Sequence, residues 1–199
     1  MADDKRGREK QARNAERRQR ERAIAAELEQ MDEPEPAIDA GELAFFETAL
    51  EELEFPVTGT DVVSEMGHRK LESGGETYSV AELLPATESV TFESPEAVRM
   101  QVQRPSVATA IKRIVEAAES VQGADFTGSQ REAYEKTFLE LQVIDPVDED
   151  EGISVLRDWV IERLRKTETM PDSRAVRRRA AEYCRENGYE VRSDEWLGV

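Results

Sequence analysis

The chain has 199 residues and a formal net charge of −17, and 36% of its residues are charged. No run approaches the roughly 20 apolar residues that a membrane helix needs, and the charged start of the chain does not resemble a secretory signal. We therefore expect a cytoplasmic protein with no membrane partner. A single cysteine, Cys184, excludes an internal disulfide, and a single histidine, His68, excludes a His/Cys zinc cluster.

The charge is unevenly distributed. Residues 1–22 carry nine basic and five acidic side chains, whereas residues 23–156 carry eight basic and thirty acidic ones. Arginine accounts for 21 of the 27 basic residues. An acid-rich surface with few lysines is typical of proteins adapted to concentrated salt, where the repulsion between carboxylates is screened. The composition therefore predicts a halophilic protein.

The chain divides into an arm, a linker and a body. Residues 1–31 are rich in Arg, Glu, Gln and Ala and predict an arginine-rich helical arm. The prolines and acidic residues of 32–38 predict a short extended linker. Residues 39–199 then form an acidic, mostly helical body.

The first part of the body predicts short helices around a hairpin. Asp39 can cap a helix with apolar residues at helical spacing, and residues 58–67 suggest a second helix capped by Thr58 or Thr60. A β-hairpin is expected near 69–79, because the glycines at 74 and 75 tolerate the positive φ of a tight turn. One helical turn at 80–84 follows.

Longer helices are predicted for the rest of the body. Prolines at the first helical position predict helices starting at Pro95, after the capping hydroxyl of Ser94, and at Pro105. Ser129 and Glu132 have the spacing of a capping box and predict the start of another helix.

The last two helices form a helix-turn-helix hairpin near 153–187, in which Asp172 starts the second helix and Gly188 ends it. The expected fold is mainly α, a compact helical body with one small β-hairpin and a projecting basic N-terminal helix.

Two segments resemble proteins of a known kind. The segment 55–63, continuing through Gly67 and the Gly-Gly hairpin to residues 80–84, resembles small haloarchaeal domains of unknown function. The tail 187–199 resembles the ends of longer haloarchaeal hypothetical proteins. The resemblance implies salt adaptation and a cytoplasmic setting, and it implies no activity and no functional residue.

No set of residues predicts catalysis. His68 has no nucleophile motif, phosphate loop or dinucleotide fingerprint to accompany it. Cys184 lies on the apolar face of the last helix, where a thiol is expected to be buried. The acidic run at 148–151 lacks the ligand spacing of a calcium loop. We therefore expect no enzyme activity, no cofactor and no metal.

Arginines on two helices are the best candidates for a binding site. They are Arg13, Arg17, Arg18, Arg20 and Arg22 in the arm, and Arg174, Arg177 and Arg178 on the last helix. Arginine pairs bidentately with phosphate, and the second helix of a helix-turn-helix can enter a major groove. The favoured hypothesis is a non-catalytic protein whose arm engages RNA or a ribonucleoprotein. The alternatives are a protein–protein adaptor or assembly factor and a helix-turn-helix DNA-binding regulator.

Overall fold

The computed structural model describes residues 37–144 and 151–189. Internal contacts divide the chain into Met1–Glu35 and Pro36–Val199, and every described residue belongs to the second unit. The predicted arm at 1–31, most of the linker at 32–38, the acidic residues 148–150 and the tail after Tyr189 lie outside the described residues.

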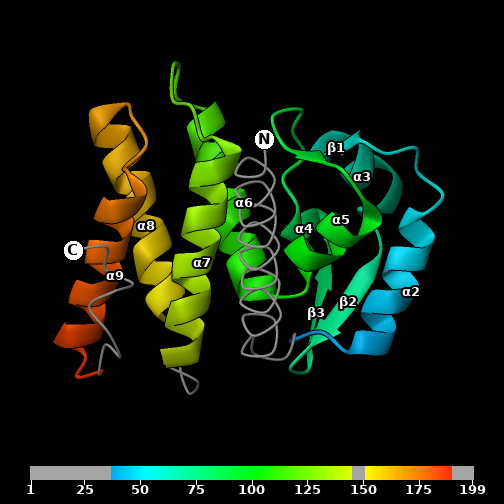
Figure 1. Cartoon of the computed structure of the whole chain (residues 1–199), viewed down its shortest axis with the longest axis horizontal. Helices are drawn as coiled ribbons and strands as arrows, with labels where there is room; N and C mark the ends of the chain where they lie inside the picture. Colours follow the sequence, from blue (N-terminus) through cyan, green and yellow to red (C-terminus); the bar gives the residue numbers. More distant parts are fainter. Residues whose placement is uncertain (1–36, 145–150, 190–199) are drawn as a thin grey trace, which may run out of the picture. The chain divides into compact units, whose positions relative to one another are not determined.

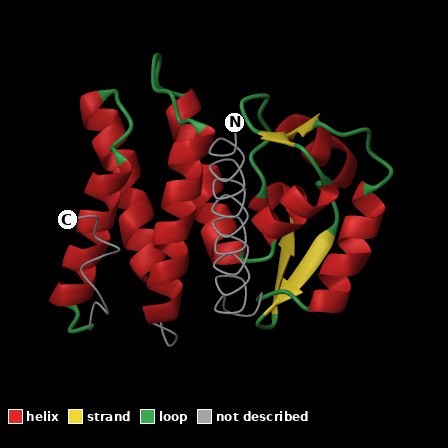
Figure 2. Cartoon of the chain, viewed as in Figure 1, coloured by secondary structure: helices red, strands yellow, loops and turns green. Residues whose placement is uncertain are grey.

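The first half of this unit is built on two short antiparallel sheets and several short helices (Figures 1 and 2). Strands β2 (Lys70–Ser73) and β3 (Glu76–Ser79) form the predicted hairpin. Gly74 and Gly75 form the turn between them with φ angles of 59° and 87°. A residue with a side chain adopts such positive φ angles only at a cost in energy. The other elements here are α2 (Ala40–Leu50), β1 (Val57–Thr58), α3 (Gly59–Met66), α4 (Val80–Leu83), β4 (Thr91–Phe92) and α5 (Pro95–Val102).

Side-chain caps explain where most of these helices begin. The carboxylate of Asp39 accepts hydrogen bonds from the first N–H groups of α2. Thr58 and Asp61 form a capping box at α3, and the Ser94 hydroxyl accepts from the Ala97 N–H at α5. These caps satisfy N–H groups that a helix leaves without partners, so the starts were predictable from the residues.

Four longer helices form the second half: α6 (Pro105–Glu119), α7 (Gly128–Ile144), α8 (Glu151–Thr167) and α9 (Ser173–Glu186). Helix α6 packs against α7 and α8 and also against α4 and α5. Helix α9 packs against α7 and α8. In the described residues no helix is long and apolar enough to cross a membrane.

One hydrophobic core runs through both halves. Its buried side chains come from all eight described helices, from the hairpin through Leu71, and from Ile38. The apolar face of α6 is buried, with Ile111 only 1% exposed. The mainly helical fold with a small hairpin is therefore confirmed.

Two details differ from the sequence prediction. Helix α7 begins after Thr127, whose hydroxyl accepts from the Gln130 N–H at 3.3 Å, and not at the predicted Ser129. Pro105 is the first residue of α6, as predicted, and Arg104 before it makes no capping hydrogen bond. A second sheet, in which β1 pairs with β4, was not predicted, because two-residue strands carry no alternating pattern.

Candidate functional site

The candidate site lies on the helical hairpin of α8 and α9. Helix α8 buries Ile153, Leu156 and Val160 along one face, and α9 buries Val176 and Ala180. Figure 1 shows the two helices alongside each other with opposite chain directions. The residues beside these buried faces, on both helices, line a groove at the surface.

The turn between these helices is anchored from a third helix. The hydroxyl of the buried Tyr134, on α7, donates a hydrogen bond of 2.5 Å to the carbonyl oxygen of Pro171. Burial, helped by the nearby negative charge of Asp172, raises the pKa of Tyr134, so this hydroxyl keeps its proton and remains a donor. Asp172 caps α9 by accepting from the Ala175 N–H at 2.7 Å. The start of α9 is therefore held in place by two independent contacts.

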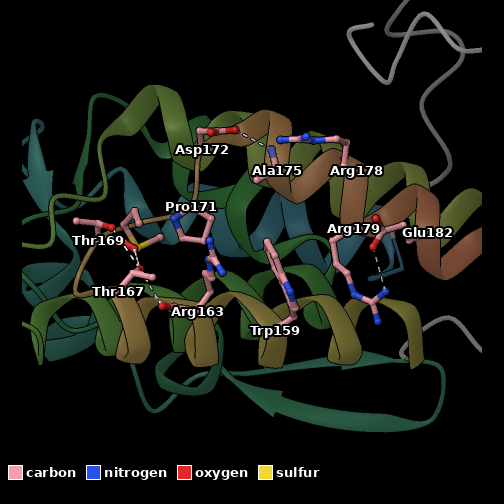
Figure 3. A pocket seen from close by; sticks show the side chains of 11 residues that line it. Trp159, Arg163, Thr167, Thr169, Pro171, Asp172, Ala175, Arg178, Arg179 and Glu182 are labelled. Carbon is pink, nitrogen blue, oxygen red and sulfur yellow. Dashed lines mark hydrogen bonds and ion pairs between the residues drawn. The ribbon is translucent and has the colours of Figure 1, made fainter.

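Between the two helices lies a hollow of about 430 Å³, the α8–α9 groove (Figure 3). In Figure 3 the indole of Trp159 stands between the side chains of Arg163 and Arg179 and points from α8 toward α9. Arg178 extends from α9 at the other rim. The remaining lining residues are Thr167, Thr169, Met170, Pro171, Asp172, Ala175 and Glu182.

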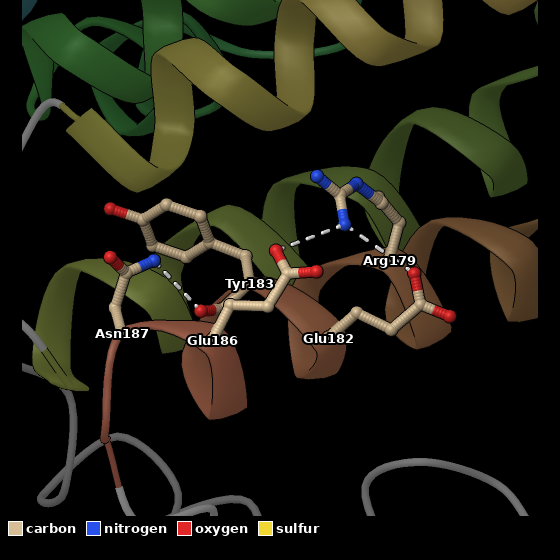
Figure 4. Close-up of polar contacts among 5 residues, drawn as sticks. All are labelled: Arg179, Glu182, Tyr183, Glu186 and Asn187. Carbon is tan, nitrogen blue, oxygen red and sulfur yellow. Dashed lines mark hydrogen bonds and ion pairs between the residues drawn. The ribbon is translucent and has the colours of Figure 1, made fainter.

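The carboxylates that line the groove already have partners. Asp172 is occupied by the cap of α9. Arg179 forms ion pairs with Glu182 at 3.4 Å and with Glu186 at 3.5 Å, as Figure 4 shows. Figure 4 also shows the Asn187 amide donating to the Tyr183 carbonyl oxygen at 2.9 Å, which helps to close the last turn of α9.

Two carboxylates elsewhere on α8 are occupied as well. Lys166 donates to Glu162 at 2.6 Å, and this hydrogen bond holds the pKa of Glu162 below its usual value. Arg157 pairs with Asp158 at 2.8 Å and likewise lowers the pKa of that carboxyl. These acids are therefore already engaged by cations of their own helix.

Two groove arginines have no ion pair among the described residues, Arg163 and Arg178. Both side chains are exposed. Residues 157–187 carry nine basic and six acidic side chains, in a chain with 44 acidic and 27 basic residues overall. The hairpin is thus a locally basic surface on an acidic protein, and these two guanidinium groups line the same groove as the indole of Trp159.

The predicted site residues are only partly brought together. Arg178 lines the groove, whereas Arg174 is exposed and is not among its lining residues. The half-buried Arg177 donates to the carbonyl oxygen and hydroxyl of Ser173 on its own helix. The predicted residues of the arm, Arg13, Arg17, Arg18, Arg20 and Arg22, lie outside the described residues.

Sequence reasoning missed the α8 side of the groove. Trp159 and Arg163 are four residues apart, a spacing that places both on one helix face, and this was the available signal. Trp159 packs partly against the core, beside the apolar face of α8. Its second role depends on α9 lying across from it.

The other candidate residues are not part of a binding or catalytic site in the described part of the chain. His68 is exposed, and Cys184 is buried as predicted. A smaller hollow of about 190 Å³ is lined partly by Ser89, but the Ser89 hydroxyl donates to Glu119 at 2.9 Å. Within 37–144 and 151–189, no three His, Cys, Asp or Glu side chains are grouped to hold a metal ion.

Comparison with known proteins gives one match. Residues 41–113 match the model of a family described as a family of unknown function, DUF5789. The chain is similar to that family over this region, which is less than half of its length. No curated protein matches the chain, and no solved structure matches it. The matched region ends within α6, so the α8–α9 groove lies beyond it.

Proposed function

We propose that this protein is a non-catalytic binding protein whose partner is RNA or a ribonucleoprotein. One observation carries the proposal: Arg163 and Arg178 flank the α8–α9 groove and find no carboxylate among the described residues, in a chain with an excess of carboxylates. A guanidinium group without an ion partner attracts an anion. Phosphate suits this position, because a guanidinium binds it through two parallel hydrogen bonds.

The shape of the hairpin supports RNA over duplex DNA. In a DNA-reading helix-turn-helix the two helices cross at about 90–120°, and the second one projects into the major groove. Here α8 and α9 lie alongside each other, and α9 also packs against α7. Because α9 packs against both α7 and α8, less of its surface is free to enter the major groove of DNA.

The arm and the setting complete the proposal. The arginine-rich residues 1–22, with their excess of basic side chains, are proposed to add phosphate contacts. The low lysine content and the thirty acidic side chains of residues 23–156 support a protein adapted to a high-salt cytoplasm of haloarchaeal type. In such a medium long-range attraction is screened, so binding must rely on close contacts such as those the groove offers.

A paired-variant measurement tests the proposal. The full chain and two double variants, R163Q/R178Q in the groove and R165Q/R185Q outside it, would be titrated with an unstructured ten-nucleotide oligouridylate between 0.2 and 1 M KCl. The control pair removes the same charge from exposed arginines of the same two helices. We expect the groove variant to bind at least tenfold more weakly and its salt slope to fall by about 1.4, roughly 0.7 for each phosphate that is no longer bound.

The affinity of the control variant should fall by less than threefold. Equal losses in the two variants would show a general charge effect and would refute the groove as the site. If nuclease treatment of a lysate leaves the captured partner attached to the chain, the protein–protein adaptor replaces RNA as the function.

A further inference from the structure

We infer that the α8–α9 groove binds a single-stranded nucleic acid segment, with one unpaired base stacked on the indole of Trp159 and the adjoining phosphates on Arg163 and Arg178. This inference rests on the proposed function and names the form of the nucleic acid. The first observation is the position of Trp159, which packs partly against the core and also lines the groove. One part of the ring is thereby fixed while another part is open to a ligand.

The open part of the indole has no internal partner. Within the described residues the cation–π pair is that of Arg69 with Phe45, so no guanidinium covers the Trp159 ring. Its indole N–H makes no hydrogen bond to any described residue. Tryptophan side chains at buried positions usually satisfy this N–H, and the ring is a preferred surface for stacking. An aromatic surface and an available donor therefore lie side by side.

The two arginines are placed to hold a chain that passes over this ring. Arg163 follows Trp159 by four residues on α8, a rise of about 6 Å along the helix. Arg178 reaches the groove from α9, at the opposite rim (Figure 3). A base on the indole would thus lie in a groove to which each of the two helices contributes a guanidinium with no ion pair among the described residues. Aromatic side chains beside backbone-binding cations are the usual arrangement in proteins that bind single strands.

The position of Trp159 between two helices favours an unpaired strand over a duplex as the ligand. Bases within a duplex are stacked on their neighbours, so a ring between two helices reaches a base only when that base is unpaired. The groove volume of about 430 Å³ lies in the range of pockets that hold small ligands. It is therefore a site for one or two nucleotides. An acidic peptide would also satisfy the arginines, and a polyglutamate probe separates the two ligands.

The test uses the fluorescence of Trp159. The chain has two tryptophans, Trp159 and Trp196, so the Trp196→Phe variant leaves Trp159 as the reporter. This full-length variant would be titrated in 0.5 M KCl with a ten-nucleotide oligouridylate, with a duplex RNA of equal length, and with a ten-residue polyglutamate. We expect quenching by the single strand, and at least tenfold weaker binding of the duplex.

Substitution at Trp159 provides the second readout, measured by anisotropy of a labelled oligouridylate. Trp159→Leu keeps an apolar side chain but removes stacking, and we expect a 5- to 100-fold loss of affinity with little change in salt slope. Trp159→Phe should restore part of the affinity. Thermal melts of both variants establish that the chain is folded. If Trp159→Phe binds no more tightly than Trp159→Leu, the inference is overturned.

The outcomes separate this inference from the proposed function. If Arg163→Gln weakens RNA binding while Trp159→Leu does not, RNA binding stands and base stacking is wrong. If the duplex binds as tightly as the single strand, the inference is also wrong. If polyglutamate quenches Trp159 and neither RNA does, both the inference and the proposed function are overturned.

Discussion

Gly59 occupies a position where the structure leaves no room for a side chain. It is the first residue of α3, is buried, and donates its N–H to the carbonyl oxygen of Val90 at 2.8 Å. A methyl group added at Gly59 would overlap the carbonyl oxygen of Pro85 and approach that of Thr87 to 3.2 Å. Both contacts are with backbone atoms, which cannot rotate away as a side chain would. We therefore predict that Gly59→Ala destabilises the fold.

The magnitude follows from what has to move. The chain at Thr87 is held by the Thr60 N–H, which donates to the Thr87 carbonyl at 3.2 Å, and by the Thr87 hydroxyl, which contacts Glu119 on α6. Overfilling a packed site of this kind costs about 1–3 kcal/mol. Alanine regains less than about 1 kcal/mol from its better helix propensity. The net loss should be about 1–2 kcal/mol, or roughly 2–8 °C in Tm for a chain of this size.

Gly41→Ala is the matched control for this prediction. Gly41 is exposed on α2, and a methyl group there would meet only Asp39 Oδ1 at 3.0 Å. This oxygen caps α2, so the small cost of shifting it offsets the gain in helix propensity. Urea unfolding followed by circular dichroism, with all chains in the same KCl buffer, gives the free energy of unfolding. Gly41→Ala should leave it within about 0.5 kcal/mol of the parent chain. If Gly59→Ala is equally neutral, the close packing of α3 on residues 85–87 is wrong.

The remaining predictions concern charge. Burial raises the pKa of the Glu135 carboxyl on α7, although Gln101 and Arg131 act in the opposite direction. A raised folded-state pKa stabilises the protein below the unfolded value near 4.3, and that contribution is lost as the pH rises through the folded pKa. Glu135→Gln should therefore raise the Tm at pH 7 relative to the parent chain and lose this advantage by pH 4; thermal melts showing the same difference at both pH values would contradict the assignment. The parent chain should melt at a higher temperature in 2 M than in 0.1 M KCl, because the thirty acidic side chains of residues 23–156 repel one another when unscreened, and an equal or lower Tm in 2 M KCl would refute salt adaptation.

Local signals were sufficient for most of the fold. The hydroxyl and proline at residues 94 and 95, the paired glycines of the hairpin and the carboxylate of Asp172 each act on their own few residues of backbone. Their effect does not depend on the rest of the molecule, and the structure has each element where the sequence predicted it. The predicted start of α7 was wrong because two hydroxyl residues have the spacing of a capping box. Thr127 precedes Gln130 by three residues and Ser129 precedes Glu132 by three, so the pattern does not distinguish them.

The site was harder to predict because it depends on which charges pair. Arg178 precedes Glu182 by four residues, a spacing as favourable for an ion pair as the three residues between Arg179 and Glu182. The structure pairs Glu182 with Arg179 and leaves Arg178 at the rim of the groove. The packing of α9 against α8 makes this choice, and one-dimensional spacing cannot report it. The same packing brings Arg178 across from Arg163, fifteen residues earlier in the chain.

The region that matches the family ends inside helix α6, so its end is not a boundary in the structure. The match ends at residue 113, yet α6 continues to Glu119, and Ile114, Val115 and Ala118 are all buried. A fragment ending at 113 would lack these side chains, and the face of α8 that packs on α6 would be without part of its support. The helices carrying the groove thus share a core with the family-like region instead of being attached to it as a separate module. Substitutions in α6 should affect the packing of both the family-like region and the α8–α9 hairpin. Sequence changes in these two regions are therefore expected to be correlated among relatives that keep the hairpin.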